Sequence, residues 1–132
     1  MITVDNIENK YLTKYKKISE KKIDQQPRIG IINGLWANLL GMGGIIPVQT
    51  SFFPSSIFLD LKLTGMQGDV MKESMNVAKT LAWNLCEEKL RNKLVKKYEK
   101  NKMQGIHIHC PEGSVPKDGP SAGTAITIAI YS

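Results

Sequence analysis

Hydrophobic side chains recur along this sequence with a spacing that changes from one region to the next. Residues 1–27 are mostly polar, with a short helix predicted after Asp5 or Asn6 and a break at Pro27. These residues hold too few apolar side chains to form a core of their own. We therefore expect a short helical arm at 1–27 and a main domain over 28–132.

Short apolar runs typical of β-strands follow the arm. Residues 29–32 and 45–48 flank the glycine-rich stretch 41–44, which predicts a hairpin with a glycine turn. The run 57–63 places apolar and polar side chains on opposite faces, which predicts a third strand. The glycines are not followed by the Lys-Ser/Thr pair of a phosphate-binding loop, so no nucleotide site is expected there.

The middle of the chain has the period of a long amphipathic helix. Its predicted N-cap is Asp69, and apolar residues recur at helical spacing up to Cys86. A basic, exposed continuation or a second short helix is expected at 93–102.

A buried strand is predicted at 106–110, where isoleucines alternate with His107 and His109. The two histidines share one face of this strand, a spacing with which a metal site can begin. No third ligand cluster follows, so the pair is interpreted as a non-metal histidine pair and no metal site is expected.

Composition and charge narrow the possible functions. The chain has 132 residues and a net charge of +6, and the basic excess lies in two lysine-rich segments, 1–28 and 87–102. Neither segment interleaves aromatic residues, so nucleic-acid binding is not expected. The absence of a long apolar run and of a signal-peptide pattern predicts a soluble intracellular protein without a membrane anchor. Cys86 and Cys110 are interpreted as free thiols of a reducing compartment.

The strongest candidate for chemistry is Ser121, which lies between Pro120 and Gly123 and directly precedes the apolar segment 124–131. If that segment is a helix, its first backbone amides lie beside the serine and favour a developing oxyanion. The alternative is an ordinary loop in which the serine caps a helix.

The arrangements of known serine hydrolases limit which catalytic mechanism Ser121 could use. Residues 119–123 match the G-x-S-x-G pattern of a nucleophile elbow, but no buried strand precedes Ser121. No His, Asp or Glu follows it within the chain, and a chymotrypsin-like order of triad residues fails as well. A serine–lysine dyad, in which a lysine of lowered pKa serves as the base, remains compatible with the sequence.

Residues 116–123, Pro-Lys-Asp-Gly-Pro-Ser-Ala-Gly, resemble the catalytic-serine signature of the Lon proteases. Three further segments resemble the same family: 106–113, 63–74, and Gly34-Leu35-Trp36-Ala37-Asn38 followed by Gly43-Gly44. In the last of these the Ala-Trp order is swapped and a short insertion follows. Residues 2–15 are similar to the end of the small helical domain that precedes the Lon protease domain.

The resemblance implies an α+β fold, the N-terminal two-thirds of a Lon proteolytic domain, truncated as presented, with small sheets and packed helices. It implies a serine endopeptidase of the ATP-dependent type that hydrolyses unfolded polypeptides. Ser121 would be the nucleophile. Site-shaping residues would be Asp118, Gly119, Pro120, His107 and His109, and residues bordering the substrate groove would be Gly34, Leu35 and Trp36.

Two departures from the family pattern qualify this expectation. The dyad lysine of the family lies a few dozen residues beyond the serine, and none of Lys72, Lys79 or Lys117 matches it. Residues 1–132 alone are therefore expected to be inactive. A Walker A motif is also missing, so ATP and Mg²⁺ are expected only on a separate ATPase module. Expected partners are that module, further copies in a ring, and polypeptide substrate; the alternative is an inactive remnant that serves as an assembly or interaction module.

Overall fold

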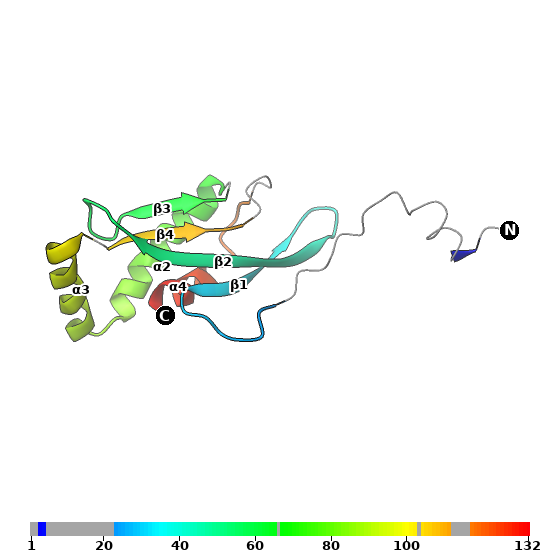
Figure 1. Cartoon of the computed structure of the whole chain (residues 1–132). Coiled ribbons are helices and arrows are strands. Elements are labelled where there is room, and N and C mark those ends of the chain that lie inside the picture. Colours follow the sequence, from blue (N-terminus) through cyan, green and yellow to red (C-terminus); the bar gives the residue numbers. More distant parts are fainter. Residues whose placement is uncertain (1–2, 5–22, 66, 103, 112–116) are drawn as a thin grey trace.

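The computed structural model describes residues 3–4, 23–65, 67–102, 104–111 and 117–132. Within them the fold is α+β, as predicted, with one four-stranded sheet and three helices (Figure 1). The elements in chain order are β1 (Ile31–Ala37), β2 (Gly43–Phe53), β3 (Leu61–Thr64), α2 (Asp69–Leu85), α3 (Glu88–Asn101), β4 (Gly105–His109) and α4 (Gly123–Tyr131). The helix predicted after Asp5 or Asn6 lies outside the described residues.

The sheet has the strand order β1-β2-β4-β3. β2 pairs antiparallel with both β1 and β4, and β3 pairs parallel with β4. β1 and β3 are therefore the two edge strands. The parallel pair is connected through α2 and α3, which agrees with the crossover that parallel neighbours require.

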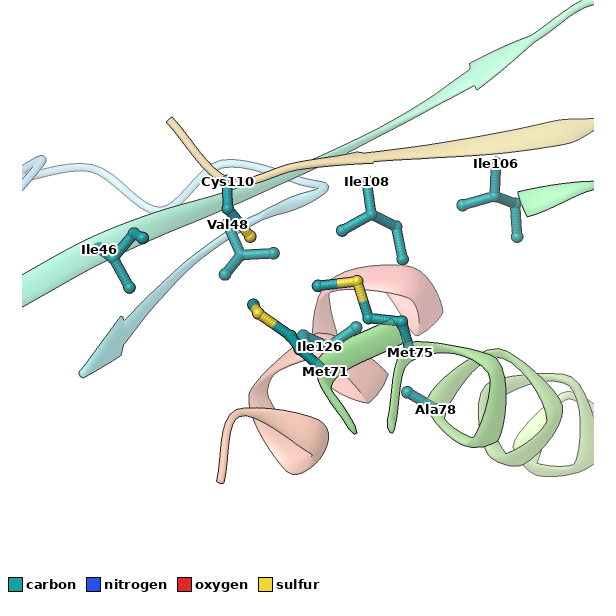
Figure 2. Close-up of a cluster of buried hydrophobic side chains, with 9 residues drawn as sticks. All are labelled: Ile46, Val48, Met71, Met75, Ala78, Ile106, Ile108, Cys110 and Ile126. Carbon is teal, nitrogen blue, oxygen red and sulfur yellow. The ribbon is translucent and has the colours of Figure 1, made fainter. Parts of the chain in front are cut away.

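The core lies between one face of the sheet and the helices α2 and α4. Figure 2 shows side chains of β2 and β4 pointing toward the two helices. The buried cluster is Ile46, Val48, Met71, Met75, Ala78, Ile106, Ile108, Cys110 and Ile126. Because α2 and α4 also pack against each other, this one cluster fixes the position of α4 on the sheet.

The predicted hairpin is present, with longer strands than the sequence indicated and with its turn before the predicted 41–44, since Gly43 and Gly44 already belong to β2. Its turn lies at Asn38–Met42, where the Asn38 backbone N–H donates to the Met42 carbonyl at 2.8 Å. The first strand begins at Ile31 and not at Ile29, because Gly30 has a φ of 75° and forms a turn. At Gly30 a side chain would also collide with the Thr50 carbonyl.

The strand predicted at 57–63 is wrong in its first half. Leu59 has a left-handed φ of 53°, and the strand begins only at Leu61. Residues before it form a loop in which the Leu59 carbonyl accepts from Lys79 Nζ at 3.0 Å and Phe58 packs edge-on against Trp83. Contacts to α2 therefore override the alternating pattern there.

The long helix is confirmed, with two corrections. Asp69 is not its N-cap, because Gly68 occupies that position. Of the predicted apolar face, Leu81 and Leu85 are exposed, whereas Met71, Met75, Ala78 and Ala82 are buried. The basic segment forms a separate helix, α3, which begins at Glu88 and contains no fully buried residue. Cys86 and Cys110 are free, as predicted.

No helix in the described part of the chain is long and apolar enough to cross a membrane.

Met75→Ala is expected to lower the free energy of unfolding by about 2–5 kcal/mol, because it empties a fully buried site in the middle of the core. The matched control is Val77→Ala on the same helix, where the side chain is 62% exposed. Urea denaturation followed by circular dichroism measures both variants. Equal losses in the two would contradict this placement of the core.

Candidate active site

Ser121 lies in a turn directly before α4, as the sequence predicted. It is exposed, and Ala122 is the N-cap of the helix. Ile126 and Ala129 of α4 are buried and anchor the helix in the core. The backbone amides at the beginning of a helix have no acceptor within the helix, so this end of α4 favours negative charge near the serine.

Asp118 connects the serine loop to the N-terminus of α2. Its Oδ1 accepts from the backbone N–H of Met71 at 2.9 Å and from that of Gly119 at 2.8 Å. The carboxylate thus caps α2 from a distant part of the chain, which is the role that the sequence had assigned to Asp69. These backbone hydrogen bonds, first from Met71 and then from Gly119, lower the pKa of Asp118 below its ordinary value.

Lys117 strengthens the same connection. The Gly68 backbone N–H donates to the Lys117 carbonyl at 2.6 Å, and Lys117 Nζ donates to the Gly65 carbonyl at 2.8 Å. Gln67 and Lys117 also form a parallel β-bridge. Lys117, in the loop before Ser121, therefore lies beside the connection from β3 to α2. Both its carbonyl and its side-chain amine are hydrogen-bonded to that connection.

Two glycines allow this close packing. A side chain at Gly68 would overlap the Asp118 carboxylate, and one at Gly123 would lie 2.9 Å from Ser74 Oγ. Ser74 Oγ also lies within 3.4 Å of the Pro120 carbonyl, to which it donates. The backbone on either side of Ser121 is thus held against the first turns of α2.

The histidine pair lies elsewhere. His107 and His109 alternate with buried isoleucines of β4, so they point away from the helices. Both rings contact Thr64 Oγ1, His107 through Nε2 at 2.8 Å and His109 through Nδ1 at 2.7 Å. Burial, followed by the charge of Lys62, lowers the pKa of His107. The structure therefore places the pair on the sheet face opposite α4, with Thr64 as its partner.

The predicted groove residues lie on β1. Gly34 is buried on the helix-covered face, against Ile46 and Val48, and Leu35 is exposed. Trp36 packs over Gly44, where any side chain would contact the indole. Among the described residues no strand pairs with the outer side of β1, the side on which an extended polypeptide could add.

This arrangement suits nucleophilic chemistry at Ser121. Asp118, Gly119, Pro120 and Ser121 come together at the junction of α2 and α4, whereas His107 and His109 do not join them. The amine of Lys79, like that of Lys117, hydrogen-bonds a backbone carbonyl. Within the described ranges, no three His, Cys, Asp or Glu side chains are arranged to hold a metal ion.

Comparison with known proteins fits this geometry. The family described as the Lon protease (S16) C-terminal proteolytic domain matches residues 1–132. The chain belongs to this family. A Lon protease homolog of Acanthamoeba polyphaga mimivirus is 39% identical over 137 residues, which cover 100% of this chain. Lon proteases of Vibrio parahaemolyticus and Fervidobacterium nodosum are 37% and 39% identical over 99% and 88% of it.

This Lon proteolytic domain sequence spans only a small part of these relatives. It covers 13% of the mimivirus and F. nodosum proteins and 16% of the V. parahaemolyticus protein.

Sequence reasoning missed three contributors to the site. Thr64 and Ser74 meet their partners only in the folded domain, since those partners lie more than forty residues away in the chain. Gln67 has one such partner: its Nε2 donates to the Ile108 carbonyl, 41 residues away, at 3.4 Å, and also to the nearby Thr64 carbonyl at 2.9 Å. Ordinary polar residues give no local signal of such long-range contacts.

Asp118→Asn tests the carboxylate cap. The folded-state pKa is lowered, so the stabilisation by the carboxylate is present above the unfolded-state value of about 3.9 and is lost as pH falls through the folded-state pKa. The wild-type chain should be more stable than the variant at pH 7, and the difference should shrink as pH falls through the folded-state pKa. Denaturant titrations at several pH values measure this difference.

Asp69→Asn is the matched control, because it removes a neighbouring charge from the same helix end without touching the serine loop. A stability difference for Asp118→Asn that persists unchanged in acid would contradict the charged cap.

Proposed function

We propose that the chain carries the nucleophile of a Lon-type serine endopeptidase that hydrolyses peptide bonds of unfolded polypeptides. The observation that carries the proposal is the position of Ser121. It is exposed just before α4, a helix anchored in the core by one face, on a loop that Asp118 holds to α2.

The proposed chemistry proceeds through an acyl-enzyme. Ser121 Oγ attacks the scissile carbonyl, and a neutral lysine amine accepts the hydroxyl proton. Backbone amides near the start of α4 stabilise the oxyanion, and the protonated lysine returns a proton to the leaving amine as the C–N bond breaks. Water then hydrolyses the ester, and the Ser121 hydroxyl is regenerated.

The base is proposed to come from polypeptide outside residues 1–132. The family resemblance assigns no lysine of this chain to the dyad, and Lys117 already donates to the Gly65 carbonyl. ATP and Mg²⁺ are proposed to act on a separate ATPase module in a ring of several copies, where they would unfold substrates.

The substrate is proposed to lie along the edge strand β1, beside Gly34, Leu35 and Trp36. Strand addition uses backbone hydrogen bonds, which every extended polypeptide offers regardless of sequence. Such recognition suits a peptidase of unfolded chains. His107 and His109 are proposed to shape the site indirectly, through β4 and Thr64, which their rings contact.

Reconstitution tests the dyad. Residues 1–132 are combined with the segment that follows the matched region in the mimivirus relative, and cleavage of an unfolded protein is followed. Activity is expected with both parts and none with either alone, and it should rise with pH as the lysine amine deprotonates.

Two variants make this experiment specific. Ser121→Ala should abolish cleavage, and replacing the dyad lysine of the added segment by methionine should abolish it while keeping the packing. Equal activity with lysine and methionine would overturn the serine–lysine mechanism. Stable binding of the two parts without any cleavage would favour the inactive assembly module.

A further inference from the structure

One long part of the chain carries no charge. Residues 29–59 contain no Asp, Glu, Lys or Arg, although the whole chain has 18 basic and 12 acidic residues. This stretch includes all of β1 and β2. The nearest charges on its N-terminal side, Asp24 and Arg28, lie 3.6 Å apart and offset each other.

In the part of the chain that the structure describes, no strand pairs with the outer edge of β1. The Thr50 N–H donates to the Gly30 carbonyl and the Asn38 N–H donates to the Met42 carbonyl, so the even-numbered residues of β1 form the hydrogen-bonded pairs with β2. The N–H and C=O groups of Asn33 and Leu35 therefore point outward. Natural edge strands are usually protected by charges, prolines or bulges, and β1 has no charge or proline.

The hairpin tip, residues 38–42, is closed by hydrogen bonds and exposes apolar side chains. Asn38 Oδ1 accepts from the backbone N–H groups of Leu40 and Met42, both at 3.0 Å, and Gly41 has a φ of 76°. The turn thus needs its Asn and Gly, whereas Leu39 is fully exposed and Leu40 is 83% exposed. Turn residues are normally polar, and the geometry of this turn does not require apolar side chains at positions 39 and 40. Figure 1 shows this end of the hairpin extending beyond α2 and α4.

These features are self-complementary. If two β1 strands pair antiparallel about a two-fold axis at Gly34, the outward groups of Asn33 meet those of the partner's Leu35. The same register brings Leu39 of the tip opposite the partner's Ile29, and Ile29 is 84% exposed. Glycine at the axis suits a pair without hydrogen bonds, in which side chains approach most closely.

Charge favours the same contact. Two copies with a net charge of +6 each repel one another, and repulsion is weakest where neither surface carries charge. The uncharged hairpin is such a surface. A lipid bilayer offers no hydrogen-bond partners to the outward N–H and C=O groups of β1. A second strand supplies those partners directly, so the uncharged surface suits another chain better than a membrane.

We propose that two copies of this chain associate through β1 and the hairpin tip, joining their sheets across the β1 edges into one. Because the proposed function assigns the same edge to substrate, this dimer is a resting form from which substrate is excluded. The proposal concerns self-association, so its test does not depend on peptidase activity.

Sedimentation velocity between about 1 and 500 µM tests the dimer, a range that spans dissociation constants corresponding to binding free energies from about −8 to about −4.5 kcal/mol. The wild-type chain should move from monomer to dimer over this range. Leu35→Pro removes one outward N–H and no bond to β2, and should be monomeric throughout. The matched control Leu35→Val keeps the N–H and should dimerise.

A double substitution tests the contribution of the hairpin tip to the affinity of the dimer. Replacing Leu39 and Leu40 together by serine should raise the dissociation constant at least about tenfold, because each buried leucine contributes a factor of this size or more. Asn33→Lys provides a second block of the edge in case proline disturbs the strand, and thermal melting checks the fold of each variant.

Hydrogen exchange gives a readout that needs no substitution. The amides of Asn33 and Leu35 should become protected as concentration rises, whereas those of Gly34 and Trp36 should be protected at every concentration. A wild-type monomer at the highest concentration would overturn the proposal. So would a dimer that forms equally well in Leu35→Pro and Asn33→Lys, because its contact would then lie elsewhere.

Discussion

The carboxylate of Asp118 is the contact on which the candidate site depends. It accepts hydrogen bonds from the first turn of α2 and from Gly119, and so holds the serine loop to a helix that begins almost fifty residues earlier. The Lys117 carbonyl and amine add two further bonds to the same junction. α4 starts directly after this loop and is anchored in the core by Ile126. Ser121 therefore takes its position from α2 on one side and from the sheet on the other.

This dependence explains the composition of the serine motif in physical terms. Gly68 and Gly123 allow main chain and side chains to approach at distances that a Cβ atom would prevent. Gly119 has a φ of 108°, a conformation that other residues rarely adopt. Close packing against α2 thus requires a glycine at position 123, and backbone conformation favours one at position 119, whereas Ser121 itself remains exposed. The serine is held by main-chain contacts, which leaves its hydroxyl available for chemistry.

Local patterns in the sequence predicted the hairpin, the long helix and the histidine strand, because each depends on the periodicity or turn chemistry of its own residues. The segment after Ser121 was predicted to be buried, with a helix there left as a condition, and it forms α4. The errors lie where distant contacts decide. Leu59 leaves the strand conformation where its carbonyl meets Lys79, and the cap of α2 comes from Asp118 and not from Asp69. The same limit applies to the histidines. Their shared face was predicted, but the side of the sheet on which they lie depends on where the helices pack.

The edge strand β1 joins the proposed function to the proposed dimer through one constraint. A strand that accepts unfolded polypeptides of any sequence has to leave its outward N–H and C=O groups unpaired, and it cannot carry the charges by which other edge strands avoid association. An uncharged, unpaired edge recognises any extended strand, including its own copy. The apolar tip at Leu39 and Leu40 increases this tendency, since it adds a contact that main-chain pairing alone does not require. Self-pairing is therefore a physical consequence of sequence-independent recognition. In the proposed dimer, each β1 edge is covered by its copy and stays out of contact with other strands until substrate competes for the edge.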